Sequence, residues 1–104
     1  MTARLIVLWE TPNDPEAFDR HYRDVHIPIA RRMTGLRRYT ISRDAQAVRG
    51  EAYYQVAELE WDTAEDLRAA FASPEGKATA ADVEDLRRYA EVRSMIVASG
   101  EDVL

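Results

Sequence analysis

The chain has 104 residues, of which 46% are hydrophobic, with four prolines, four glycines and no cysteine. This composition is typical of one globular domain, residues 1–104, and the lack of cysteine excludes disulfides, thiolate nucleophiles and cysteine metal sites. The 14 basic and 19 acidic residues give a formal net charge of −5 and are interleaved along the chain, so we expect no basic patch for nucleic acid.

The N-terminal segment predicts a buried strand rather than a targeting signal. Residues 5–9 form a continuous apolar run that ends at Glu10, which is too short for a secretory signal or a membrane span. A short run of this kind is typical of a central strand that is buried on both faces. We therefore expect a cytoplasmic protein that makes no membrane contact.

A segment rich in turn-forming residues precedes the first predicted helix. Asp14 supplies an oxygen for the helix N-cap, and Pro15 suits the first helical position. Gly35 suits the left-handed position that ends a helix. At 3.6 residues per turn, one face of this helix carries five apolar residues that we expect to pack on a core: Phe18, Tyr22, Val25, Ile29 and Met33.

The remaining elements are predicted by alternation and by capping patterns. Residues 36–44 and 52–61 read as strands, and the second of these alternates over ten residues. A capping box at Asp62–Glu65 and a second cap at Ser73 predict a helix in two pieces, the second running to about Tyr89. Residues 91–98 read as the last strand. Within the second helical piece we expect three side chains to face inward: Ala78, Val83 and Leu86.

The order β-α-β-β-α-β predicts an α+β, ferredoxin-like fold with a four-stranded antiparallel sheet and both helical layers on one face. The first and last strands are apolar on both sides, so the other face of the sheet needs a cover. A second copy of the chain is the simplest cover. We therefore expect a homodimer through sheet-to-sheet packing, which would form a dimeric α/β barrel.

Both histidines lie on the first predicted helix. His26 falls at the edge of the apolar stripe beside Tyr22, whereas His21 falls at the opposite edge. Pro28 breaks a local rule, because proline inside a helix costs about 3 kcal/mol unless the helix kinks or ends. Such breaks often mark functional places, although a tolerated kink is an equal alternative. An imidazole suits proton transfer near neutral pH, and a tyrosine hydroxyl can polarise a carbonyl oxygen.

Other candidate groups are weaker. Trp9 and Tyr39 could wall a pocket beside His26, although simple core packing explains both. His21 and His26 are five residues apart, not the three or four that align metal ligands on a helix, so we predict no metal. The sequence lacks a phosphate-binding glycine loop and a dinucleotide fingerprint, and we predict no cofactor.

The chain contains these segments of a known pattern: Phe18, Tyr22, His26–Ile29, Gly35–Leu36, Ser73–Gly76 and Ala81–Asp82. Together they resemble the EthD-like family of dimeric α/β-barrel proteins. The resemblance implies a homodimer with a pocket between sheet and helices in each subunit. It also implies small, often aromatic, lactone or polyketide-like ligands in cofactor-independent isomerisation, cyclisation or oxidation, with His26 as acid or base. The chain departs from the family in lacking a cysteine that some lactone isomerases use, and in having Ile29 where leucine is usual.

Three hypotheses follow for function. In the first, His26 moves a proton at a carbon next to a carbonyl, and Tyr22 and Tyr39 hold the oxygen. In the second, the same pocket serves a non-catalytic accessory protein that binds a metabolite or a haem-like ligand. In the third, the chain is a dimerisation module without a ligand. The substrate contacts expected under the first hypothesis are Trp9, Phe18 and Ile29.

Overall fold

The computed structural model describes residues 2–98 and 100–104. The chain forms four strands, four α-helices and one π-helical turn, η1, within this part. In order these are β1 (Ala3–Trp9), α1 (Pro15–His21), η1 (Tyr22–His26), α2 (Ile27–Ala30), β2 (Arg38–Ser42), β3 (Gln55–Trp61), α3 (Ala64–Ala72), α4 (Pro74–Leu86) and β4 (Val92–Val97).

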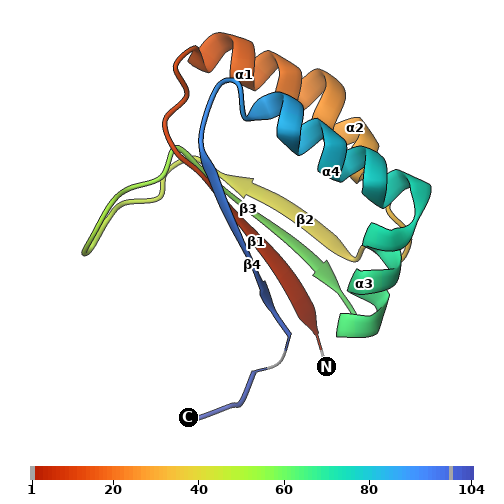
Figure 1. Cartoon of the computed structure of the whole chain (residues 1–104). Coiled ribbons are helices and arrows are strands. Elements are labelled where there is room, and N and C mark those ends of the chain that lie inside the picture. The colour runs from red at the N-terminus through yellow and green to blue at the C-terminus, as the bar shows by residue number, and fades with distance from the viewer. Residues whose placement is uncertain (1, 99) are drawn as a thin grey trace.

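The four strands form one antiparallel sheet in the order β2-β3-β1-β4. All the helices lie over one face of it, with α1, η1 and α2 forming one continuous helical segment beside α4 (Figure 1). This is the ferredoxin-like α+β arrangement, and it confirms the predicted fold, including the second helix in two pieces.

The core lies between the sheet and the helices and has two parts. One part gathers around Trp61 and Met33, close to α3. The other contains Trp9, Phe18, Tyr22, Leu86 and Ala90, between β1 and the two long helical segments. Val7, Tyr39 and Ile41 pack against both parts. Tyr22 of the second part lies against the ring of His26.

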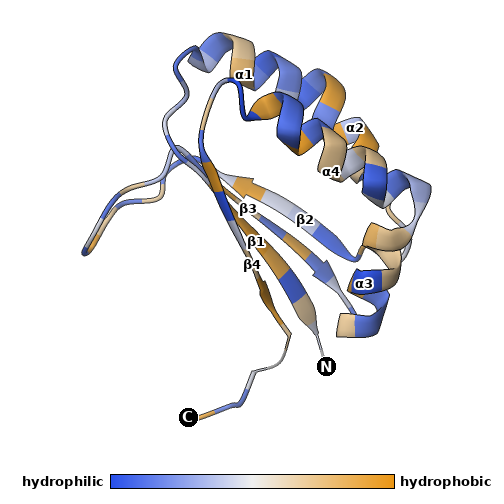
Figure 2. Ribbon diagram, in the orientation of Figure 1, coloured by the Kyte–Doolittle hydropathy of each residue, from blue (hydrophilic) through white to orange (hydrophobic). Residues whose placement is uncertain are grey.

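The opposite face of the sheet, which we call the outer face, is partly apolar. Strand alternation and register place Ile6, Leu8, Val56 and Met95 on this face in neighbouring strands. Met95 is 47% exposed. In the part of the chain that the structure describes, no helix lies over this face (Figure 1), and hydrophobic colour runs along β1 and β4 in Figure 2.

The first helix departs from the predicted stripe at Val25 and Ile29, although Phe18, Tyr22 and Met33 are buried as predicted. The backbone N–H of Ile27 donates to the carbonyl of Tyr22, five residues back, so one extra residue enters the turn. The buried positions therefore shift by one residue, from Val25 to His26 and from Ile29 to Ala30. The prediction that Val25 faces inward was wrong, since it is 39% exposed.

The wide turn has an identifiable cause at Pro28. Proline has no N–H to donate to the carbonyl of Asp24, four residues back, and its ring would clash with that carbonyl in a regular α-helix. Kinks and π turns are ordinary ways to relieve such a conflict. Pro28 instead occupies the first turn of α2, directly after η1. The expected break is therefore present, as a π turn placed before the proline.

Two details of capping and helix phase differ from the predictions. The N-cap of α3 is Thr63, whose side chain accepts from the N–H of Asp66, while Asp62 pairs with Arg37 at 2.8 Å. In α4, which ends at Leu86, the prediction for Ala78 was wrong because this side chain is exposed, whereas Leu86 is buried and Val83 is half-buried against the core, as predicted. Thr79 and Asp82 are buried as well. The caps at Asp14 and Ser73 are confirmed, as is the positive φ of Gly35, 74°.

Gly76 permits close contact between the two pieces of the second helix. A Cβ atom at this position would overlap the carbonyl oxygen of Ala70 and the Cα of Phe71. Both are backbone atoms and cannot move aside cheaply. Separately, no helix in the described residues has the length and apolar character needed to cross a membrane.

Candidate functional site

The candidate site centres on Asp82 of α4, which binds both histidines of the first helix. Nδ1 of His26 lies 2.8 Å from Oδ2 of Asp82, and Nε2 of His21 lies 2.8 Å from Oδ1. A carboxylate only accepts hydrogen bonds, so each of these ring nitrogens is the donor. The unused nitrogen of His26 is therefore Nε2.

The π turn explains how two histidines five residues apart reach one carboxylate. On a regular α-helix they would point about 140° apart. The i to i+5 hydrogen bond of η1 widens the turn, so residues at this spacing lie on one side of the helix. The expectation that His21 and His26 face apart was wrong for this reason.

The ring of His26 is buried, and its lowered pKa favours the neutral form. His26 is 5% exposed, and its ring lies against the ring of Tyr22, with 4.9 Å between the ring centroids. Burial lowers the pKa of His26, because the charged form loses its hydration, and the contact with Asp82 opposes part of this shift. Across residues 2–98 and 100–104, Nε2 has no hydrogen-bond partner.

Two tyrosine hydroxyls meet beside His26. The Oη atoms of Tyr22 and Tyr39 lie 2.5 Å apart, joining the first helical segment to β2. Burial raises the pKa of Tyr39 to about 12 and raises that of Tyr22 further, so both phenols keep their protons at neutral pH. One of the pair can donate to its neighbour while the other donates to a ligand.

A second polar network lies where β2 ends and β3 begins. Gln55 is fully buried and accepts from Nε of Arg43 at 3.0 Å, and Arg43 in turn binds Asp19 at 2.6 Å. The nearby Gln55 amide lowers the pKa of Tyr22, against the larger effect of burial. The Nε2 atom of Gln55 has no partner among the described side chains and backbone groups.

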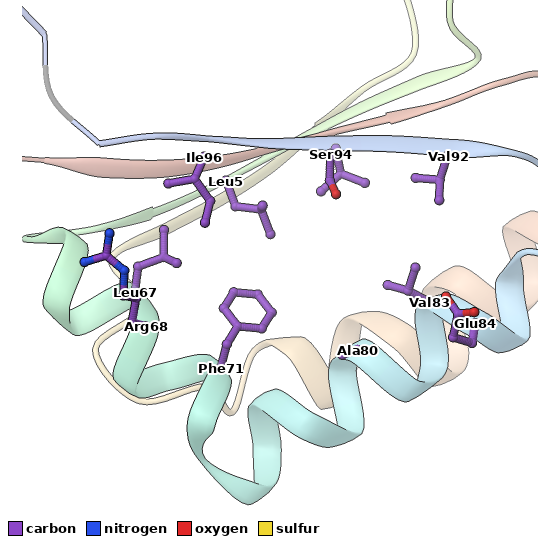
Figure 3. A pocket seen from close by; sticks show the side chains of 11 residues that line it. Leu5, Leu67, Arg68, Phe71, Ala80, Val83, Glu84, Val92, Ser94 and Ile96 are labelled. Atoms are coloured by element: carbon purple, nitrogen blue, oxygen red, sulfur yellow. The ribbon is translucent and has the colours of Figure 1, made fainter.

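Two adjoining pockets lie between the sheet and the helices. The inner pocket, of about 40 Å³, is lined by His26, Tyr22, Tyr39 and Trp9 together with apolar side chains. The outer pocket, of about 470 Å³, lies between β1 and β4 on one side and α3 and α4 on the other. Its lining is mostly apolar, with Arg68 and Glu84 as the charged members (Figure 3).

Phe71 stands between these pockets. Its ring projects from α3 towards the sheet (Figure 3), and it lines both cavities, as do Leu5, Val7 and Val83. The inner pocket has room for an oxygen atom or a water but not for a ring. An organic molecule would therefore occupy the outer pocket and reach His26 past Phe71.

The structure brings together four of the six residues predicted from the sequence. Trp9, Tyr22, His26 and Tyr39 all line the inner pocket. Phe18 lies behind them, with its ring centroid 5.2 Å from that of Trp9 and 5.8 Å from that of Tyr22. Ile29 is half-buried and does not line either pocket, because the π turn moves the buried position to Ala30.

Sequence reasoning missed three residues of the site: Asp82, His21 and Gln55. Asp82 carried a usable signal, since it lies four residues before Leu86, on the buried side of the predicted helix. Gln55 likewise faces inward in the predicted strand, where an amide needs a partner. The His21 contact requires the π turn, which no spacing rule indicates. The described residues contain no group of three or more His, Asp or Glu side chains suited to hold a metal ion.

Comparison with known proteins gives a family match. The family model of the EthD domain matches residues 10–87. An uncharacterised 11.0 kDa protein from the thcB-thcC intergenic region of Rhodococcus erythropolis is 33% identical over 81 residues, which cover 77% of this chain and 79% of the relative.

Solved structures agree with this match. An EthD family protein from Bacillus halodurans is 33% identical, with a TM-score of 0.82 over 99% of this chain and 100% of its own. SnoaB, a cofactor-independent oxygenase from Streptomyces nogalater, is 16% identical with a TM-score of 0.69, covering 98% and 96%. A dimeric ferredoxin-like protein from Thermobifida fusca is 17% identical with a TM-score of 0.69, covering 95% and 92%. The last two show likeness of fold alone.

Proposed function

We propose that this chain, which belongs to the EthD domain family, is a cofactor-independent enzyme for small molecules in which His26 transfers a proton. The observation that carries the proposal is the contact between Nδ1 of His26 and Asp82. This contact leaves the lone pair of Nε2 free, in a ring that lines the inner pocket. A carboxylate behind the ring fixes its tautomer and stabilises the imidazolium that forms when it accepts a proton. The description of SnoaB as a cofactor-independent oxygenase supports chemistry of this class on this fold.

The proposed step begins with a carbonyl compound whose oxygen lies at the tyrosine pair. Nε2 of His26 accepts a proton from the neighbouring carbon, and the electron pair of the C–H bond forms an enolate. Tyr39 or Tyr22 donates a hydrogen bond to the enolate oxygen, since both phenols are protonated. Asp82 stabilises the positive charge on His26.

The fate of the enolate decides the reaction type. Return of the proton from Nε2 to another carbon gives isomerisation, and attack on a second carbonyl gives cyclisation. Oxidation requires dioxygen as a co-reactant that accepts the electrons. All three begin with the same proton transfer, so a test of that step addresses the whole proposal.

The outer pocket would hold the body of the substrate. Its lining is mostly apolar, which suits a ring system or an alkyl skeleton whose carbonyl end passes Phe71. We also propose that two chains pair through their outer sheet faces, because Ile6, Leu8, Val56 and Met95 form an apolar strip there. The description of the Thermobifida fusca protein as dimeric supports pairing, though not a particular face.

Deuterium exchange tests the proton transfer without knowledge of the natural substrate. A panel of cyclic ketones and lactones, such as 1-tetralone and α-phenyl-γ-butyrolactone, is incubated with the protein in D₂O, and uptake at the carbon next to the carbonyl is followed by mass spectrometry. We expect catalysed uptake for at least one compound and a loss of about 10²-fold or more in His26→Gln.

The matched control for this experiment is Arg20→Gln, an exposed position on the same helix. This variant should exchange at the wild-type rate. Catalysed exchange that is equal in wild type and in a folded His26→Gln variant would refute the role of His26.

A second candidate function is binding without conversion. The outer pocket favours it, because it can hold an apolar molecule without any contact to His26. In that case a compound from the panel would raise the melting temperature while its deuterium uptake stays at the rate in buffer. This outcome would identify a metabolite-binding accessory protein.

A further inference from the structure

We propose that His21 is a positioning residue for His26, acting through the Asp82 carboxylate that both side chains bind. The inference rests on the proposed role of His26 as a base. Each histidine holds a different oxygen of Asp82, at 2.8 Å in both cases. The orientation of the carboxylate therefore depends on two contacts, one of which His21 supplies.

The three side chains differ in their access to solvent. The side chain of His21 is 17% exposed, whereas those of Asp82 and His26 are 5% and 7% exposed. His21 therefore lies on the solvent side of the cluster, and the buried carboxylate of Asp82 links it to His26.

Few other ionisable groups face His26. Tyr22 of η1 stacks on its ring, Tyr39 of β2 shares its pocket, Asp82 comes from α4 and His21 from α1. The tyrosines stay protonated at neutral pH, because burial raises the pKa of both. The charges that act on His26 are therefore those of Asp82 and His21, and they act in opposite directions.

The single negative charge of Asp82 therefore interacts with both imidazole rings. When His21 is protonated, its cation lies against Oδ1 and opposes a second cation on His26. When His21 is removed, the whole charge of Asp82 is left to His26, and the pKa of His26 should rise. The carboxylate also loses the contact that fixes one oxygen, so the Nδ1–H tautomer of His26 should be less dominant.

The experiment uses the full chain labelled with ¹⁵N-histidine, and reads the tautomer and pKa of His26 from two-bond ¹H–¹⁵N spectra between pH 5 and 8.5. In wild type we expect Nδ1 protonated and Nε2 unprotonated. In His21→Leu we expect the pKa of His26 to rise by about half a unit to one unit, with mixed tautomers. In His21→Gln, which keeps a donor but loses the charge, we expect the pKa to rise and the tautomer to be retained.

The control is again Arg20→Gln, which should reproduce the wild-type spectrum of His26. A folded His21→Leu variant with the wild-type pKa and tautomer of His26 would overturn the inference. If that variant does not fold, an unchanged pKa in His21→Gln overturns it. The spectra require no substrate, so the two proposals can be tested separately. Unchanged spectra in the His21 variants would overturn the role of His21 even if deuterium exchange depends on His26. Exchange that does not depend on His26 would overturn the proposed function even if the spectra change as expected.

Discussion

Replacing Asp82 by asparagine tests the centre of the site. The carboxylate accepts from two histidine rings and is 5% exposed. Hydrogen bonds to a charged group contribute about 1.5–3 kcal/mol each, and neutral ones about 1 kcal/mol. Asparagine keeps the shape, but its single carbonyl oxygen can accept a hydrogen bond from only one of the two ring N–H groups. Its NH₂ group then faces the other ring N–H, so two donors meet. We therefore expect the variant to lose about 2–4 kcal/mol of unfolding free energy at pH 7.5.

Urea unfolding followed by tryptophan fluorescence measures this loss as a lower midpoint at an unchanged slope. The matched control is Asp85→Asn, an exposed carboxylate on the same helix, which should stay within about 0.5 kcal/mol of wild type. A loss below about 1 kcal/mol in Asp82→Asn would refute the reasoning, because it would mean that neither histidine contact has the strength of a charged hydrogen bond.

Three further predictions follow from the fold and from the titration of His26. Gly76→Ala should lose about 3 kcal/mol or more in the same urea assay, because its Cβ would overlap backbone atoms of Ala70 and Phe71, whereas Gly100→Ala, which meets nothing within 4 Å, should be neutral. Burial lowers the pKa of His26 in the folded state, so the unfolded chain binds the proton more readily, and the free energy of unfolding should fall as pH drops below about 6.5. In His26→Gln this free energy should fall less steeply between pH 7 and 5. An equal pH dependence in wild type and variant would contradict this prediction. Met95→Glu on the outer sheet face should convert a homodimer to a monomer in light scattering, and a monomeric wild type at micromolar concentration would contradict the proposed pairing.

Much of the fold was predictable because it follows local rules. Alternation in residues 52–61 identified the inward side of β3, and the caps at Asp14 and Ser73 located two helix starts. These signals depend on neighbours in sequence, so they survive without tertiary information. Element ends were less predictable. β2, β3 and β4 are shorter than their patterns, whereas β1 begins at Ala3, before the apolar run, because pairing with a neighbour decides where a strand begins and ends.

The site was predictable only in part, because its key contact depends on a π turn. Pro28 signalled a break in the helix, but not the extra residue that moved the buried position from Val25 to His26. A helical wheel with a fixed 100° step cannot represent such a change. Asp82 was missed for another reason. Its position four residues before Leu86 indicates the buried side of the helix, but an acidic residue on a helix is usually exposed unless it has a buried partner.

The central claim is that a carbonyl compound reacts with its carbon at His26 and its oxygen at the tyrosine pair. A crystal structure with a carbonyl compound bound, such as a ketone or lactone from the exchange panel, tests this most directly. We predict the carbon next to the carbonyl within about 3.5 Å of Nε2 of His26, and the oxygen within hydrogen-bond distance of Tyr39 or Tyr22. A compound that undergoes exchange but binds with no atom near Nε2 would contradict the account.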